Sequence, residues 1–234
     1  MSELASGTKA LPGAKVPLLG LVVLGLVAFS ALFVLIDNSY YTFANARFPN
    51  VGTSAWLATL WGVVSRAHLL ICIIPLVLWQ PHLFGFQIGK TWQHWRMVLV
   101  MLLANCGVIA AYLWLTSSTT PYSGNQWLLT EVVTVPVVEE IFWRGLVFTA
   151  LLFVLRRQYS ENTSSHLAVW LSGIAFGALH AANSLAGVPI AFVMIQVLNA
   201  TIWGVVYGYA RAKTDSIYPP MLLHAAMNLV VILF

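Results

Sequence analysis

The chain has 234 residues, of which 60% are hydrophobic and only 8% are charged. An ordinary soluble domain carries roughly 25% charged residues, so this composition excludes a soluble enzyme, a disordered tail, a nucleic-acid-binding protein and a disulfide scaffold. A helix that crosses a membrane needs about 20 predominantly apolar residues, and the chain contains several such stretches. We therefore expect an all-α protein, a polytopic bundle of transmembrane helices.

The predicted spans follow one another along the chain with short polar or turn segments between them. The apolar stretches predict about seven membrane-spanning helices, at residues 17–36, 56–79, 96–116, 127–155, 167–183, 189–210 and 217–234. We divide the chain accordingly into an N-terminal tail (1–16), a first part with three helices (17–126) and a core of four helices (127–234).

The basic residues predict the orientation of these helices. Cytoplasmic loops of membrane proteins are enriched in Lys and Arg. Eight basic residues fall on alternate connections that share one side of the membrane, namely Lys9, Lys15, Lys90, Arg96, Arg156, Arg157, Arg211 and Lys213. The opposite side holds only Arg47. We therefore expect a cytoplasmic N-terminus. The localisation expected is separate from this charge pattern and is a multi-pass position in the bacterial inner membrane.

The predicted span 127–155 contains an unusual group of charges, in the sequence EEIFWRG at residues 139–145. An ionisable side chain at the centre of a membrane costs at least about 2.5–3.5 kcal/mol, so each one is a candidate functional residue. Glu140 and Arg144 are four residues apart, which predicts that they share a helix face and form an ion pair. Glu139 points about 100° away from Glu140. A pair that only locks the helix would leave this second carboxylate unexplained.

Two later spans also carry polar groups at membrane depth. His180 lies in the predicted span 167–183, one turn after Phe176. His224 and Asn228 lie one turn apart in the predicted span 217–234 and therefore face the same way. Each of these groups taken alone is also compatible with hydrogen bonding between helices. Polar groups on three spans are most easily satisfied when they meet one another.

Such a meeting of Glu, His and Asn is typical of hydrolase chemistry. A carboxylate with a nearby His can take a proton from water, while Asn and a second His donate to the oxyanion that forms. The alternative is a zinc site, in which Glu139, His180 and His224 would be the ligands. Other designs are excluded: there is no H-E-x-x-H sequence and no G-x-S-G sequence, and the only aspartates, Asp37 and Asp215, are expected outside membrane depth.

The three motifs together resemble those of a known family. E-E-x-x-x-R (Glu139, Glu140, Arg144), F-x-x-x-H (Phe176, His180) and H-x-x-x-N (His224, Asn228) occur in this order on three late helices. The pattern is similar to that of the CAAX protease and bacteriocin-processing family, which includes the type II CAAX prenyl endopeptidases and the Abi proteins. The resemblance covers residues 127–234 and implies an intramembrane endopeptidase.

The resemblance also implies a role for each matching residue. Glu139 corresponds to the catalytic carboxylate and His180 to its partner in activating water. His224 and Asn228 correspond to the pair that stabilises the oxyanion, and Arg144 to the arginine that supports Glu140. We favour a mechanism without a metal cofactor, because Asn is a poor zinc ligand and a good oxyanion donor. Zinc is the alternative cofactor.

The function predicted is cleavage of a peptide bond in a membrane-associated protein or peptide, with the lipid bilayer as the other partner and no nucleic acid. The first alternative is a membrane protein of the immunity type that binds a peptide without cleaving it. The second is a small transporter that relays protons. The predicted span 56–79 holds two further polar residues, Arg66 and His68, to which the motifs assign no role. Two alternatives are open: both residues line the same cavity, or the Arg66 side chain extends to the membrane surface.

Overall fold

The computed structural model describes residues 15–116, 125–186 and 188–233, and these residues form helices and no strand. The prediction of an all-α fold is therefore confirmed. The helices are α1 (Lys15–Arg47), α2 (Ala55–Trp79), α3 (Trp95–Thr116), α4 (Val135–Glu140), α5 (Phe148–Leu155), α6 (Glu161–Leu179), α7 (Ile190–Thr214) and α8 (Tyr218–Leu233). Nearly all of the expected tail 1–16 lies outside the described residues.

The number of membrane spans stays a prediction. Four helical stretches in the described part of the chain are long and apolar enough to cross a membrane: Leu18–Arg47, Thr91–Thr116, Glu161–Leu185 and Ile190–Thr214. Helix α2, which contains Pro75 and is bent by 60°, is a fifth if its two arms form one span. The region predicted as the span 127–155 is divided by two π-helical segments, η4 (Thr130–Thr134) and η5 (Ile141–Val147), and α8 has only 16 residues.

Helix α1 is longer than predicted. We expected the first span to end at residue 36 and a loop to follow, yet the helix continues to Arg47. Ser39 and Thr42 do not break it, because their hydroxyls donate to the carbonyls four residues earlier, at 2.9 and 2.8 Å. The helix ends just before the Phe48–Pro49 step, because a residue that precedes proline avoids the helical conformation.

Helix α6 also begins earlier than predicted, at Glu161 instead of residue 167. The Ser160 side chain accepts a hydrogen bond from the backbone N–H of Thr163 at 3.3 Å and so caps the helix. The polar stretch that follows was expected to be a loop, but it is the first part of this helix. The helix ends at Leu179, and His180 opens a 3₁₀ segment, η6 (His180–Ala186).

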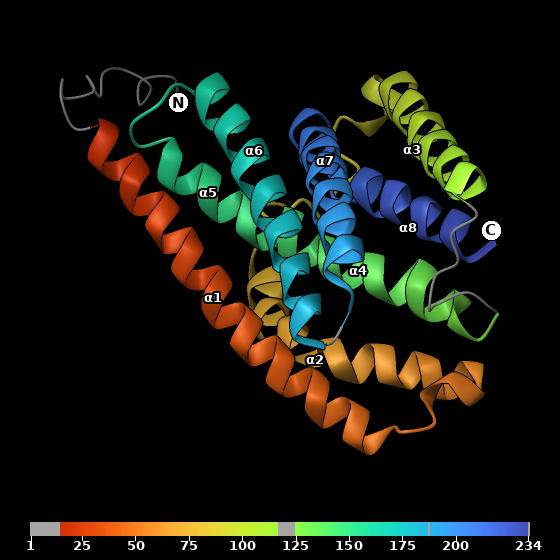
Figure 1. Ribbon diagram of the computed structural model, residues 1–234. Helices are drawn as coiled ribbons and strands as arrows, with labels where there is room; N and C mark the ends of the chain where they lie inside the picture. The colour runs from red at the N-terminus through yellow and green to blue at the C-terminus, as the bar shows by residue number, and fades with distance from the viewer. Residues whose placement is uncertain (1–14, 117–124, 187, 234) are drawn as a thin grey trace.

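Helices α6 and α7 run side by side, and α3 lies beside α8, while α1 follows the outer side of the bundle (Figure 1). The segment from α4 to α5 crosses the middle of this arrangement, where α4 packs against α2 and α8. Residues from the predicted spans 127–155, 167–183 and 217–234 are thereby brought together in the centre of the bundle.

The close approach of α6 to α7 depends on glycine. A Cβ atom at Gly173 would lie 2.7 Å from the backbone nitrogen of Val205 and 3.0 Å from the carbonyl carbon of Gly204. The first distance is shorter than real Cβ contacts and the second is tighter than most of them, and backbone atoms cannot move away as a flexible side chain can. The absence of a side chain at Gly173 therefore sets the distance between the two helices.

We expect Gly173→Ala to lower the free energy of unfolding by about 1–3 kcal/mol, because overpacking forces the backbones apart. Gly107→Ala in α3 is the control, since a Cβ there meets nothing within 4 Å. That control should be neutral or slightly stabilising, because alanine favours a helix over glycine. Denaturant titration of both variants in detergent checks the prediction, and equal stability of the two would contradict it.

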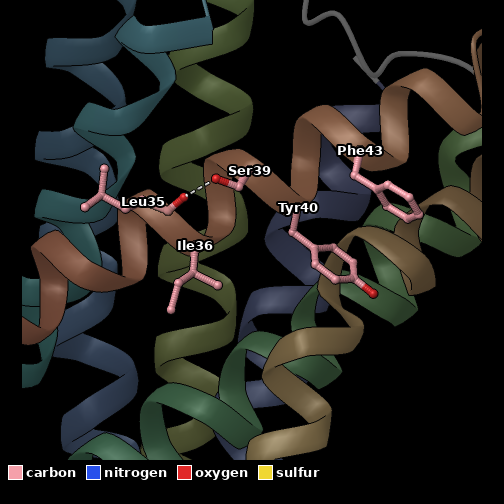
Figure 2. A pocket seen from close by; sticks show the side chains of 5 residues that line it. All are labelled: Leu35, Ile36, Ser39, Tyr40 and Phe43. Atoms are coloured by element: carbon pink, nitrogen blue, oxygen red, sulfur yellow. Dashed lines mark hydrogen bonds between the residues drawn. The ribbon is translucent and has the colours of Figure 1, made fainter.

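A shallow hollow of about 640 Å³ lies on α1 and is lined by Leu35, Ile36, Ser39, Tyr40 and Phe43 (Figure 2). None of the candidate catalytic side chains lines it. In Figure 2 the five residues project from the same helix, and the only polar interaction drawn is the bond from Ser39 to the Leu35 carbonyl. The hollow is therefore an apolar feature of the outer surface and is separate from the polar cluster described next.

Candidate active site

The Glu140 carboxylate lies at the centre of a buried polar cluster. Its Oε1 atom accepts a hydrogen bond from Arg144 at 2.9 Å, as the four-residue spacing predicts. The same oxygen accepts a second bond from Nδ1 of His224, also at 2.9 Å. The side chains of Glu140 and Arg144 are completely buried, and that of His224 is only 5% exposed. The bond fixes the His224 ring and leaves its Nε2 as the nitrogen available to a ligand.

Arg144 is held by more than this ion pair. Its second terminal nitrogen donates to the carbonyl of Gly204 on α7 at 3.0 Å. Its guanidinium lies over the ring of Phe176 at 4.6 Å and over the ring of Tyr207 at 5.4 Å. A buried cation needs such compensation, because burial removes it from water. Arg144 thus ties the Glu140 segment to α6 and α7.

Glu139 has a different environment from its neighbour. It pairs with Arg66 of α2, with 3.7 Å between Oε1 and Nε, and both side chains are 20% exposed. Glu140 is sealed and its Oε1 already accepts two bonds, whereas Glu139 is in a looser pair and remains accessible. The two adjacent glutamates therefore differ in exposure: Glu140 is a buried structural carboxylate, whereas Glu139 is an open carboxylate, partly exposed at its surface.

His180 lies close to this open carboxylate. Its Nδ1 donates to the carbonyl of Phe176 at 2.9 Å, which leaves Nε2 free to accept a hydrogen bond. Glu139 and His224 both lie within the range at which their charges act on His180. The Phe176 ring is perpendicular to the His180 ring, with 5.0 Å between centroids. The spacing F-x-x-x-H thus supplies both the hydrogen-bond acceptor and an aromatic wall for this histidine.

Asn228 enters the cluster through an irregularity in the helix before α4. In the π-helical segment Thr130–Thr134 the N–H of Val135 donates to the carbonyl of Thr130, five residues earlier. The corresponding partner of the Glu131 carbonyl would be Pro136, which has no N–H. The Asn228 amide donates to this carbonyl instead, at 2.7 Å. A second N–H of Asn228 remains for a ligand, because a primary amide has two.

The candidate zinc ligands do not form a metal site in this structure. Among the residues that the structure describes, no three His, Cys, Asp or Glu side chains are placed to hold a metal ion together. Nδ1 of His224 is directed to Glu140 and not to Glu139. Glu139, His180 and His224 therefore do not converge on one point in this arrangement, and the choice between zinc and a metal-free mechanism stays a prediction.

Arg66 and His68 have separate environments. Arg66 contacts Glu139, so of the two possibilities left open by the sequence it lines the site. His68 faces α1, where Nε2 lies 3.3 Å from Oδ1 of Asp37 and the ring lies 4.9 Å from that of Tyr40. Asp37 was expected beyond the end of the first span, but it lies within α1 because that helix is longer.

Two site residues were missed by the sequence analysis. Tyr207 stacks on the His224 ring at 5.6 Å, and Asn105 of α3 donates to the Tyr207 hydroxyl at 3.2 Å. Asn105 also donates to the carbonyl of Leu223 at 2.7 Å and is completely buried. A lone Asn in the middle of an apolar span is the kind of signal that singled out Glu139, so Asn105 was detectable.

Arg211, predicted to follow the span 189–210 in a connection, is not in a loop, and the side of the membrane on which it lies stays a prediction. It lies in the last turn of α7 and is only 5% exposed. Its Nε donates to the carbonyl of Arg144 at 3.3 Å, and a terminal nitrogen donates to the carbonyl of Leu83 at 3.4 Å. A basic side chain near the end of a helix can extend into water, but it can also donate to carbonyls inside the protein that have no other partner, as Arg211 does.

Comparison with known proteins adds a family to this geometry. Residues 121–230 match the model of the family described as "Type II CAAX prenyl endopeptidase Rce1-like". No curated protein and no solved structure matches the chain. The family implies peptidase activity and a protein or peptide substrate in the membrane, and the apolar helices agree with an integral membrane protein. All six candidate residues of the cluster lie within this matched segment, which covers a little less than half of the chain and is similar to the Rce1-like type II CAAX prenyl endopeptidases.

Proposed function

We propose that the chain is an intramembrane endopeptidase in which Glu139 and His180 activate a water molecule without a metal cofactor. The observation that carries this proposal is the separation of the two glutamates. Glu140 is sealed by Arg144 and His224, whereas Glu139 is 20% exposed and close enough to His180 for its charge to act on that imidazole. An accessible carboxylate beside an imidazole suits the removal of a proton from water.

The other residues of the cluster have complementary roles in this proposal. As Glu139 takes the proton, the water oxygen forms a bond to the carbonyl carbon of the scissile peptide, whose oxygen becomes negatively charged. His224, in the form that carries a proton on each ring nitrogen, donates from Nε2 to this oxyanion while Nδ1 donates to Glu140, and the remaining N–H of Asn228 is the second donor. Glu140 orients His224, as a carboxylate does in other hydrolases, and Arg144 holds Glu140. The proton then passes to the leaving amine, and the peptide bond breaks.

The setting proposed for this reaction is the bacterial inner membrane, with a membrane-associated protein or peptide as the substrate. The apolar outer surface of the bundle and the burial of the cluster inside it support a substrate that reaches the site from the lipid phase. A peptide bond there would be shielded from bulk water, so the site has to bind and activate its own water molecule.

We expect His180→Ala to lower the cleavage rate by about 100-fold or more, because it removes the imidazole beside Glu139. His166→Ala is a matched control: His166 lies on α6, the helix that leads into His180, and its Nδ1 likewise bonds to the carbonyl four residues earlier, at 2.9 Å. His166 is far along α6 from the cluster, so this variant should cleave at the wild-type rate.

The measurement is the rate at which new peptide termini form in membranes that contain each variant at the same level. Equal rates for His180→Ala and wild type would contradict the proposal. Cleavage by wild type that stops on prolonged chelation and returns with zinc would contradict the metal-free part alone. Persistent binding or protection by His180→Ala without any cleavage by wild type would favour a non-catalytic peptide-binding protein.

A further inference from the structure

The Arg66–Glu139 pair joins the matched family segment to a part of the chain outside it. Arg66 belongs to α2, whereas the family match begins at residue 121. Glu139 has no other ion pair among the residues that the structure describes. The cation that accompanies the proposed base therefore comes from the N-terminal half of the chain.

The charges within the cluster make this cation necessary. Glu140 is already matched by Arg144 at 2.9 Å, and that pair is completely buried. Glu131 interacts electrostatically with both Arg66 and Glu139. Two carboxylates in a low-dielectric environment repel each other and each is costly to bury, so a cation whose charge acts on both stabilises both.

Arg66 is itself held in place by its neighbours. One terminal nitrogen donates to Oγ of Ser65 at 3.2 Å, and the guanidinium lies 5.9 Å from the ring centre of Trp61. Trp61 in turn donates from its indole N–H to Oδ1 of Asn45 on α1, at 2.9 Å. These contacts within α2, and the bond from Trp61 to α1, hold the Arg66 side chain in the position where it pairs with Glu139. A cation that reached toward the membrane surface would not need such contacts.

We infer that Arg66 is a positioning residue for the reaction: it holds the Glu139 carboxylate toward the site and offsets the cost of its charge. This inference rests on the proposed function. The loose distance of 3.7 Å and the 20% exposure of both side chains suit such a role, because the carboxylate is held and still accessible to water. A sealed pair like Glu140–Arg144 would instead make the base unavailable.

The test compares Arg66→Gln, Arg66→Lys and the control Arg47→Gln, which removes an exposed cation that lies over Phe43 at the end of α1. The probe is a fluorogenic peptide that spans the strongest cleavage site of the wild type. We expect Arg66→Gln to lower kcat at least about tenfold with little change in KM, because a small displacement of a catalytic group has a large effect on rate. Arg66→Lys keeps the charge and should recover most of the rate, and Arg47→Gln should match wild type.

A purely structural role would give a different pattern. It would reduce the folded fraction and the midpoint of thermal unfolding, while the folded molecules would retain their kcat. Wild-type kcat in Arg66→Gln, or equal losses in Arg66→Gln and Arg66→Lys, would overturn the inference. If Glu139→Gln is inactive in the same assay while Arg66→Gln is fully active, only the inference fails. If Glu139→Gln cleaves at the wild-type rate, the proposed function fails as well.

Discussion

Glu139→Gln should abolish peptide cleavage while the protein remains folded. The substitution keeps the size of the side chain and removes the carboxylate that accepts the proton from water. General acid–base catalysis contributes roughly 10²–10⁴-fold to a rate, so the single-turnover rate should fall by about this factor. Because Glu139 is 20% exposed and its ion pair with Arg66 is the only one it makes with the described part of the chain and is loose, its neutralisation should change stability little.

The control for this experiment is Glu161→Gln. Glu161 pairs with Arg156 at 2.8 Å, and its side chain is 81% exposed, so it carries the same chemical change at a site without catalytic groups. Its cleavage rate should equal that of the wild type. A Glu139→Gln protein that cleaves as fast as the Glu161→Gln protein would show that the open carboxylate is not the base.

The second large effect expected is on stability, from Arg144→Met. This variant leaves the buried Glu140 carboxylate without its cation, and an uncompensated buried charge costs about 3–5 kcal/mol. The free energy of unfolding, measured by denaturant titration in detergent, should fall by that amount. Methionine fills most of the same space between Phe176 and Tyr207, so the loss reports on charge more than on packing.

The exposed Arg156–Glu161 pair provides the matched control. Its distance of 2.8 Å is close to the 2.9 Å of the buried pair, and the two differ in exposure. Arg156→Met should therefore cost less than about 1 kcal/mol. The double variant Glu140→Leu with Arg144→Met should recover part of the loss, because it removes both charges together. Similar losses for Arg144→Met and Arg156→Met would contradict the buried network.

The sequence predicts the helices well where apolar stretches are bounded by turns. Helix α2 at Ala55–Trp79 and α3 at Trp95–Thr116 differ by one residue or less from the expected spans. The hydropathy pattern does not predict helices that are built from polar residues, as in the last part of α1 and the first turns of α6. Their side chains bond to the helix backbone or cap it, and no hydropathy pattern reveals this.

The cluster itself is only partly predictable. The spacing of Glu140 and Arg144 predicts their pair because one turn of one helix joins them. The partner of Glu139 is not predictable, because Arg66 lies 73 residues away along the chain on another helix and only packing brings them together. The contact of Asn228 with the Glu131 carbonyl depends on the π-helical segment Thr130–Thr134. Pro136 favours this segment, but the presence of a proline does not by itself predict a π-helix.

The most direct test of the account is a comparison of peptide termini in membranes of cells that produce the wild-type chain, Glu139→Gln or Glu161→Gln at equal levels. The account predicts a set of new termini within or next to membrane-spanning segments, present with wild type and Glu161→Gln and absent with Glu139→Gln. The same set of termini in all three membranes would contradict the assignment of Glu139 as the base of an intramembrane peptidase.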